Sequence, residues 1–412
     1  MNLHFGSICV RNPQTNFQHA QPHMEPIIAS TTFSYDDPEA LMEVFSGEQK
    51  GFIYSRWSNP TIELAENKIA ALEACGITHA DGTPLQLTAR MFSSGMGAIN
   101  TLFMSVLKSG DKILAQENLY GGTSELLNKI LSQQGVQPLL MDLKNLQHVE
   151  ERVKQDPAIK MLYIETPSNP TIDCYDIEAL TNIAKSSKLV VAVDNTFASP
   201  YLQQPFRFGA DFVVHSTTKY LNGHGNSIGG MLIHQEAAPF EKAIFDYRKL
   251  LGSNSNAFDA WLLLQGVKTL EIRMQRHCQN ARQVAEFLQA HPKISKVNYA
   301  GLASHRDHAV AKKQMRDFSG MLSFELKDGL EAGKQLMKRI RLCQLAVSLG
   351  TVDTIIQHPA SMSHAGVAKS VREQYGITDG LVRLSVGLED AADLISDLEQ
   401  ALSDAASLAK ES

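Results

Sequence analysis

The chain has 412 residues, of which 43% are hydrophobic and 20% are charged, proportions typical of a globular protein rather than a disordered or collagen-like one. At about 150 residues per domain, this length predicts two to three domains. The formal net charge is −6, so lysine and arginine offer no surplus to neutralise a phosphate backbone. Nucleic-acid binding is therefore not expected.

Neither a membrane span nor a secretion signal is predicted. No apolar run approaches the ~18 residues needed to cross a bilayer, and the N-terminus lacks a basic start followed by an apolar stretch. The cysteines are scattered without a C-x-x-C pair, which favours reduced thiols over disulfides or structural zinc. They are Cys9, Cys75, Cys174, Cys278 and Cys343. We therefore expect a cytoplasmic protein with no bound metal.

Residues 1–60 differ from the rest of the chain. They are rich in polar and turn residues and show little helix or strand periodicity, so we do not expect them to bury a core of their own. We predict an arm that wraps the body of the protein or contacts a neighbouring subunit. A helix is predicted from Thr61 to Ala74, because its apolar residues share one face and Asn59-Pro60 marks its start.

Between about residue 90 and residue 235, short apolar runs alternate with amphipathic stretches. Continuous apolar runs are typical of strands covered on both faces, so we predict an α/β domain over 61–256 with a mostly parallel central sheet and helices on both faces. Ligands bind beyond the carboxyl ends of such strands. The runs are 113–115, 139–141, 161–164, 189–193, 212–214 and 231–233, and the helical stretches include 98–107 and 177–184.

Residues 257–412 show a different pattern of apolar residues. A long helical stretch runs to about residue 288, and an alternating pattern then predicts strands and helices in turn. The predicted strands are 320–326 and 382–386, and the predicted helices are 332–340 and 391–405. This order predicts a smaller C-terminal α+β domain.

Two of the predicted strands are followed by residues able to carry chemistry. Asp194 follows the 189–193 run, where a carboxylate is costly without a cationic partner, although an aspartate there can equally cap a helix. Lys219 follows the 212–214 run among hydroxyl side chains. Such a lysine can act as a nucleophilic amine, whereas most lysines are simply solvated.

A glycine turn and a tyrosine lie at two further strand ends. Gly95-Met96-Gly97 leads into the helix predicted at 98–107, and backbone amides at a helix start bind anions. Asn100 stands where the dinucleotide fingerprint requires a third glycine, which disfavours a nicotinamide enzyme. Tyr120, beside a glycine pair, can be either a packed or a catalytic side chain.

An anion site, a carboxylate and a lysine at one edge of a sheet are the groups that pyridoxal phosphate (PLP) requires. Its phosphate binds amides and hydroxyls, its ring nitrogen binds a carboxylate, and its aldehyde forms a Schiff base with a lysine. Asp194 and Lys219 are separated by one βαβ step, which predicts that they lie on different strand ends.

Eight short strings, in order along nearly the whole chain, carry a family resemblance. They are YSRWSNPT (54–61), SSGMGAI (93–99), LYGGT (119–123), ETPSNP (165–170), VDNTFASP (193–200), HSTTKYLNGH (215–224), AVSLG (346–350) and LVRLSVGLED (381–390). The chain resembles the PLP enzymes of cysteine and methionine metabolism, the trans-sulfuration family. This resemblance implies an aspartate-aminotransferase-like fold and a homotetramer made of two active dimers.

The resemblance also implies roles around the cofactor. Lys219 would form the Schiff base and shuttle protons, Asp194 would pair with the pyridine nitrogen, and Tyr120 would stack on the ring and act as an acid or base. The implied phosphate ligands are Gly95, Met96, Ser216 and Thr218, joined by Tyr54 and Arg56 from the neighbouring subunit.

The substrate side is implied in the same way. Arg383, with Asn169 and Ser348, would bind the substrate carboxylate, a task that suits the forked guanidinium group. In the family, lyases tend to carry an acid at the place of Asp353, where O-acylhomoserine sulfhydrylases tend to carry arginine or lysine. The string 357–364 is more similar to methionine γ-lyases than to cystathionine enzymes.

Two features depart from that pattern. Many bacterial methionine γ-lyases have a cysteine at the place of Gly122, and the stretch between Cys75 and Phe92 is longer than in the family. We nevertheless expect a carbon–sulfur lyase that works by α,γ-elimination, with methionine γ-lyase ranked first and cystathionine γ-lyase second. A γ-replacement enzyme, either an O-acylhomoserine sulfhydrylase or a cystathionine γ-synthase, is the third alternative.

Other classes are ranked lower. Ser216-x-x-Lys219 also fits acyl-serine hydrolases, but the S-D-N and K-T-G boxes of that class are missing. A non-catalytic carrier of the cofactor would need neither Arg383 nor the arm that holds Tyr54 and Arg56. Four histidines lack metal-ligand spacing and are predicted to be structural: His215, His224, His358 and His364.

Overall fold

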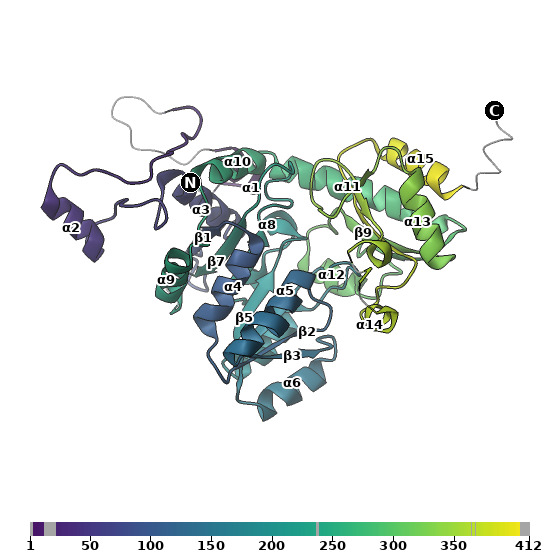
Figure 1. Ribbon diagram of the computed structural model, residues 1–412, viewed down its shortest axis with the longest axis horizontal. Coiled ribbons are helices and arrows are strands. Elements are labelled where there is room, and N and C mark those ends of the chain that lie inside the picture. The colour runs from purple at the N-terminus through teal and green to yellow at the C-terminus, as the bar shows by residue number, and fades with distance from the viewer. Residues whose placement is uncertain (1–2, 12–21, 236–238, 364, 367, 404–412) are drawn as a thin grey trace. The chain divides into compact units, whose positions relative to one another are not determined.

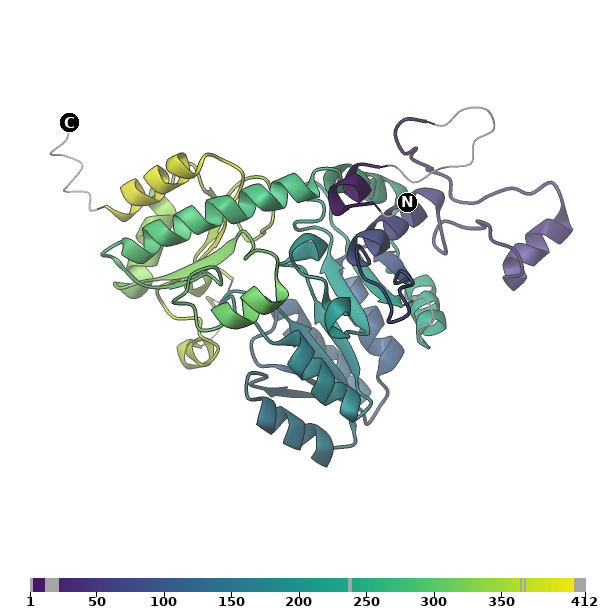
Figure 2. The same ribbon diagram turned by 180° about the vertical axis from the view of Figure 1, so that it is seen from behind.

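The computed structural model describes residues 3–11, 22–235, 239–363, 365–366 and 368–403 (Figures 1 and 2). The contacts divide the chain into two compact units. Unit 1 comprises 1–116, 121–164 and 177–271, and unit 2 comprises 117–120, 165–176 and 272–412. Two short loops, 117–120 and 165–176, therefore interrupt unit 1 and belong to unit 2.

Unit 1 is built on a seven-stranded sheet in the order β1-β7-β6-β5-β4-β2-β3. Parallel pairing joins β5 to β6 and β2 to both β3 and β4, whereas β7 runs antiparallel to β6 and to the edge strand β1. Each predicted run overlaps a strand, which confirms the mostly parallel sheet. The strands are β1 (Leu87–Phe92), β2 (Lys112–Gln116), β3 (Gln137–Met141), β4 (Ile159–Glu165), β5 (Val190–Asp194), β6 (Phe212–Ser216) and β7 (Gly230–Gln235).

Helices cover each face of this sheet, as the two opposite views show (Figures 1 and 2). The predicted helices are present with small shifts of their ends: α3 (Pro60–Glu73), α4 (Gly95–Val106) and α7 (Ile177–Ser186). Helix α3 starts as predicted, because the Asn59 side chain accepts a hydrogen bond from the Thr61 amide at 2.9 Å. The other main helices of unit 1 are α6 (Leu146–Gln155), α9 (Glu241–Leu251) and α10 (Ala257–Val267).

The N-terminal arm contains two short helices that the sequence pattern did not predict. Helix α1 (Phe5–Val10) wraps onto α3, with Phe5 buried and the Lys68 ammonium donating to the Ile8 carbonyl at 2.9 Å. Helix α2 (Pro38–Ser46) buries none of its residues and projects away from the sheet of unit 1 (Figure 1). Residues 1–2 and 12–21 of the arm lie outside the described residues.

The long stretch between Cys75 and Phe92 forms a small turn that leads into β1. Thr78 and Pro84 form an isolated antiparallel bridge, and the Asp81 carboxylate accepts a hydrogen bond from the Thr83 amide at 2.9 Å. The extra residues therefore close on themselves before the edge strand begins.

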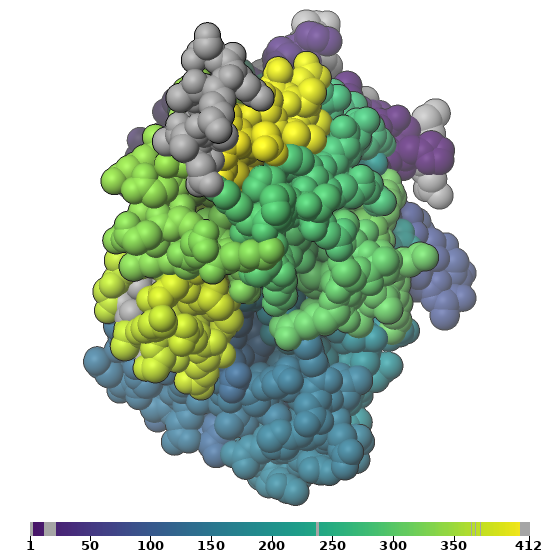
Figure 3. Space-filling view, turned by 90° about the vertical axis from the view of Figure 1, so that its right-hand side faces the viewer, coloured from purple at the N-terminus to yellow at the C-terminus, as the bar shows by residue number. Residues whose placement is uncertain are grey.

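Unit 2 contains a five-stranded sheet in the order β10-β11-β12-β9-β8. One face packs against the long helix α11 (Leu270–Ala290), α13 (Gly329–Arg339) and the C-terminal helix α15 (Ala391–Leu402), and Figure 3 shows α15 lying against α11. This is the smaller α+β arrangement that was predicted. Its strands are β8 (Ile294–Asn298), β9 (Met321–Leu326), β10 (Gln344–Leu345), β11 (Ile355–Gln357) and β12 (Leu381–Ser385).

The helical stretch predicted from 257 to about 288 is two helices, α10 and α11. At the end of α10 the Lys268 amide donates to the Gln265 carbonyl and the Thr269 amide to that of Gly266. These i→i+3 bonds tighten the last turn and end the helix before α11 begins. Helix α15 ends at Leu402, and 404–412 lie outside the described residues.

Within the described part of the chain, no helix is both long enough and apolar enough to cross a membrane.

A buried ion pair joins three elements of unit 1. The Arg248 guanidinium on α9 donates to the Glu66 carboxylate on α3 at 2.6 Å, and Glu66 also accepts the Met91 amide of β1 at 2.8 Å. Both side chains are almost completely buried. Glu66 has a second, longer contact with the Arg90 guanidinium, at 3.5 Å. Removing one charge of a buried pair costs far more than the pair contributes.

We expect Arg248→Met to lower the free energy of unfolding by about 3 kcal/mol, the low end of the range for breaking a buried pair, because buried Glu66 keeps only the longer of its two arginine contacts, with Arg90. The midpoint of urea unfolding measures this effect. The matched control is Lys242→Ala, which breaks the exposed Lys242–Asp246 pair and should change stability by no more than about 0.5 kcal/mol. Equal effects of the two variants would contradict the interpretation.

Candidate active site

The carboxyl ends of β5 and β6 bring the predicted carboxylate and lysine to one edge of the sheet. The two strands pair in parallel with Asp194 opposite Val214. Beyond the strands, the Asn195 amide donates to the Val214 carbonyl and the Ser216 amide to the Thr196 hydroxyl, both at 2.9 Å. Lys219 follows three residues after β6 ends and is half-buried.

Asp194 is held in a defined orientation. Its Oδ1 accepts a hydrogen bond from the Thr196 amide at 3.0 Å, and its Oδ2 accepts one from the Tyr163 hydroxyl at 3.2 Å. Burial raises the pKa of Asp194, while the bonds from Thr196 oppose that shift. A cation opposite this carboxylate would favour its charged form.

The start of α4 forms a cradle with the segment after β6. The Ser94 hydroxyl caps the helix by accepting the Gly97 amide at 3.1 Å, and the Gly95 and Met96 amides precede the first intrahelical bond. A Cβ added at Gly95 would lie 3.0 Å from the Cβ of Ser216. The Ser216 side chain therefore lies directly against this helix terminus, and any larger residue at position 95 would crowd it.

Thr218 is fixed at the same place by Gly229. The Thr218 hydroxyl accepts the Gly229 amide at 3.0 Å and donates to the Gly229 carbonyl at 3.3 Å. A Cβ at the next residue, Gly230, would lie 2.1 Å from the Ser94 carbonyl oxygen. The strand that supports Thr218 must therefore approach the helix start without a side chain.

These groups match the parts of PLP. The amides and hydroxyls at the start of α4 suit a phosphate, and a buried carboxylate suits a protonated ring nitrogen. Lys219 extends from the segment that carries Ser216 and Thr218 and can supply the amine. The residues present therefore fit the cofactor predicted from the sequence.

Unit 2 assembles the residues predicted to bind a carboxylate. Arg383 on β12 is buried, and its guanidinium donates to Asn169 Oδ1 at 3.1 Å and to the Ser348 carbonyl at 2.8 Å. Asp353, which follows Ser348 closely in the sequence, is exposed. The structure thus brings Arg383, Asn169 and Ser348 into contact.

Tyr120 lies in the 117–120 loop of unit 2, with its ring 46% exposed. Its amide donates to the Glu165 carboxylate at 2.7 Å. In the sequence Glu165 follows the apolar run 161–164 directly, a pattern that assigns it no particular role. Its position at the end of a buried strand was the signal that could have identified it.

Tyr54 and Arg56 lie in an exposed turn of the arm. The Arg56 guanidinium donates to the Lys249 carbonyl at 2.6 Å and lies 5.6 Å from the centroid of the Tyr54 ring. Among the described residues, neither of these contacts of Arg56 involves a residue of the cradle at the start of α4. A role at a phosphate would therefore depend on a second copy of the chain.

The histidines have ordinary structural partners. His215 Nε2 lies 2.5 Å from Glu73 Oε1 in the interior of unit 1, and His358 contacts Ser361 Oγ and the Asp379 carbonyl, each at 2.8 Å. His224 contacts the Asn222 carbonyl at 2.6 Å, and His364 lies outside the described residues. Among the described residues, no group of three or more potential ligands is placed to hold a metal.

Comparison with known proteins identifies the same cofactor. Residues 6–403 match the family model described as Cys/Met metabolism PLP-dependent enzyme. An L-methionine gamma-lyase of Fusobacterium nucleatum subsp. polymorphum is 47% identical over 378 residues, 92% of each chain. A cystathionine gamma-synthase of Mycobacterium bovis is 42% identical over 377 residues, 92% of this chain and 91% of that protein.

A solved structure supports the same assignment. The crystal structure of cystathionine gamma-lyase from Lactobacillus plantarum complexed with L-serine has a TM-score of 0.87 and 34% identity, covering 97% of this chain and 98% of that one. None of these proteins supports the acyl-serine hydrolase alternative. The chain is an enzyme whose cofactor is PLP, and it belongs to the family of PLP-dependent enzymes of cysteine and methionine metabolism.

Proposed function

We propose that this enzyme is a methionine γ-lyase, converting L-methionine and water to methanethiol, 2-oxobutanoate and ammonia. The observation that carries the proposal is the 47% identity, over 92% of each chain, with a protein that has this activity in its name. Asp353, the acid expected in lyases, supports elimination over replacement. Cystathionine γ-lyase is the second candidate, because a solved relative with a TM-score of 0.87 bears that name.

The proposed roles follow the chemistry of the residues. PLP, when bound, withdraws electrons from the substrate's α-carbon and so makes the α-proton acidic. Asp194 Oδ keeps the ring nitrogen protonated, and Gly95, Met96, Ser216 and Thr218 hold the phosphate. Lys219 Nζ would hold the cofactor through its aldehyde, and the same Nζ would accept the α-proton of the substrate.

The remaining roles concern the substrate. Arg383 binds its carboxylate through two parallel hydrogen bonds, with Asn169 and Ser348 fixing the guanidinium in place. The Tyr120 hydroxyl, on an exposed residue, delivers a proton to the departing γ-sulfur, which leaves as the thiol. We assign Asp353 to substrate binding as well.

We further propose a homotetramer of two active dimers in the cytoplasm. The apolar side chains of α2 are exposed in the single chain, at 63% for Met42 and 58% for Phe45, and a second copy would cover them. Tyr54 and Arg56, on the same arm, would then reach the neighbour's phosphate. Five free thiols suit a reducing compartment. The proposed domains are the arm 1–60, the PLP-binding domain 61–256 and the C-terminal domain 257–412.

Substrate choice is tested by offering methionine, cystathionine, and O-acetylhomoserine plus sulfide in parallel. We expect methionine to give 2-oxobutanoate and methanethiol with the highest kcat/KM. Faster formation of a thioether or thiol product from O-acetylhomoserine than of 2-oxobutanoate from methionine would instead establish a replacement enzyme.

Lys219→Ala should abolish covalent fixation of the cofactor by borohydride, because no other amine takes its place after β6. The kcat for elimination should fall about 100- to 10,000-fold, the range associated with loss of a general base. Peptide mapping of the reduced wild-type protein identifies the labelled lysine. Lys242→Ala, at an exposed lysine of α9, is the control and should label normally. Labelling of any peptide without residue 219 would refute the proposed role.

Shared active sites are tested by mixing two inactive chains, Arg56→Ala and Lys219→Ala. After joint refolding, a mixed dimer contains one site with both residues intact, so part of the activity should return. Each variant refolded alone is the control. Mixed oligomers that form but stay inactive would show that Arg56 acts within its own chain.

A further inference from the structure

Glu165 joins two backbone segments that carry proposed site residues. It is the last residue of β4 and is buried. Its Oε2 accepts the amide of Tyr120 at 2.7 Å, and its Oε1 accepts the amide of Asn169 at 3.1 Å. One carboxylate therefore fixes the main chain at both residues.

The bond to Asn169 continues to the substrate-binding arginine. Asn169 Oδ1 accepts a hydrogen bond from Arg383 at 3.1 Å. Tyr120, Glu165, Asn169 and Arg383 thus form one connected series within unit 2. A shift of the Glu165 carboxylate would therefore displace both Tyr120 and the Asn169–Arg383 pair.

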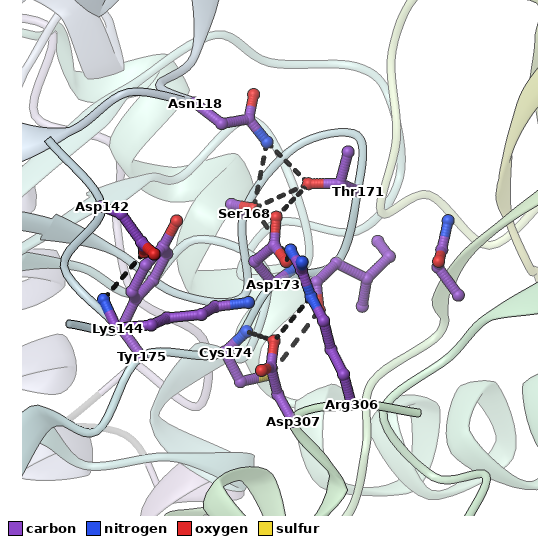
Figure 4. Close-up of polar contacts among 12 residues, drawn as sticks. Asn118, Asp142, Lys144, Ser168, Thr171, Asp173, Cys174, Tyr175, Arg306 and Asp307 are labelled. Atoms are coloured by element: carbon purple, nitrogen blue, oxygen red, sulfur yellow. Dashed lines mark hydrogen bonds and ion pairs between the residues drawn. The ribbon is translucent and has the colours of Figure 1, made fainter. Parts of the chain in front are cut away.

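A second set of bonds makes the two loops a single rigid piece, shown in Figure 4. Asn118 Nδ2 donates to Thr171 Oγ1 at 2.6 Å and to Ser168 Oγ at 3.3 Å. Thr171 and Ser168 in turn donate to Asp173, which pairs with Arg306. This set joins the two loops through side chains, whereas the Glu165 carboxylate is bonded to the backbone amides of Tyr120 and Asn169 themselves.

We propose that Glu165 is a positioning residue, which sets the Tyr120 hydroxyl and the Asn169–Arg383 pair for the reaction without itself touching the substrate. This inference rests on the proposed function, in which Tyr120 delivers a proton and Arg383 binds the carboxylate. An amide at this position has one acceptor oxygen instead of two, so Glu165→Gln leaves one of these two partly buried N–H groups without its partner.

Glu165→Gln should lower kcat/KM for elimination about 10- to 100-fold, the range expected for one lost buried hydrogen bond. The loss should appear both as a lower kcat, through Tyr120, and as a higher KM, through Asn169 and Arg383. The cofactor should still bind in full, because Asp194 and the α4 cradle lie in unit 1, and its absorption should change only as far as the stacked Tyr120 ring moves. Amino-acid affinity, measured from the change in that absorption, should fall in parallel with the rise in KM.

A double-mutant cycle with Tyr120→Phe separates positioning from a general structural effect. Without the hydroxyl there is no proton donor left to misplace, so adding Glu165→Gln should change kcat by less than about threefold while KM still rises. The control is Asp397→Asn, which removes a carboxylate that accepts the amides of Arg341, Leu342 and Cys343 in the same unit. It should lower stability but leave kcat and KM unchanged.

Two results would overturn the inference. One is a Glu165→Gln enzyme with wild-type kcat, KM and amino-acid affinity, and the other is a kcat loss that multiplies fully with that of Tyr120→Phe. Failure of the proposed function is a separate result, because it appears in the wild-type enzyme. The cycle is then run with whichever substrate the wild-type enzyme accepts, and the amino-acid affinity tests Glu165 without turnover.

Discussion

The parallel pairing of β5 with β6 is the interaction on which the candidate site depends. It aligns Asp194 with Val214, and two further bonds extend the pairing past the strand ends through Asn195 and Thr196. Because both strands run in the same direction, their polar ends meet at one edge of the sheet. A slip of one residue would turn Asp194 to the other face and separate it from the lysine segment.

Behind this edge the sheet is supported by buried charges. His215, next to Ser216, lies 2.5 Å from Glu73 in α3, and the Asn195 side chain also donates to Glu73 at 3.3 Å. Positive charge on His215 would favour the ionised form of Asp194, opposing the rise in pKa that burial causes. The interior thus fixes the backbone beneath the site and also influences the charge of its carboxylate.

The proposed cofactor-binding and substrate-binding residues belong to different units, a division that does not follow their order in the sequence. The cofactor residues Asp194 and Lys219 belong to unit 1, whereas Tyr120 and Asn169 leave the ends of β2 and β4 and belong with Arg383 in unit 2. Glu165 is the residue that makes the second group continuous. The groups proposed to bind the substrate are therefore held together by local hydrogen bonds.

The sequence by itself determined the strands β2 to β7, β9 and β12, the helices α3, α4, α7, α13 and α15 and the identity of the cofactor, because continuous apolar runs and polar strand ends are local patterns. It did not determine β8, β10 or β11, which are short or interrupted. It determined neither α1 nor α2, since six and nine residues of mixed polarity have no clear periodicity. It also missed the break between α10 and α11, where i→i+3 bonds end an otherwise continuous helical pattern. Only the tertiary structure placed Glu165 between Tyr120 and Asn169, because a buried carboxylate finds its amide partners through loops that are distant along the chain.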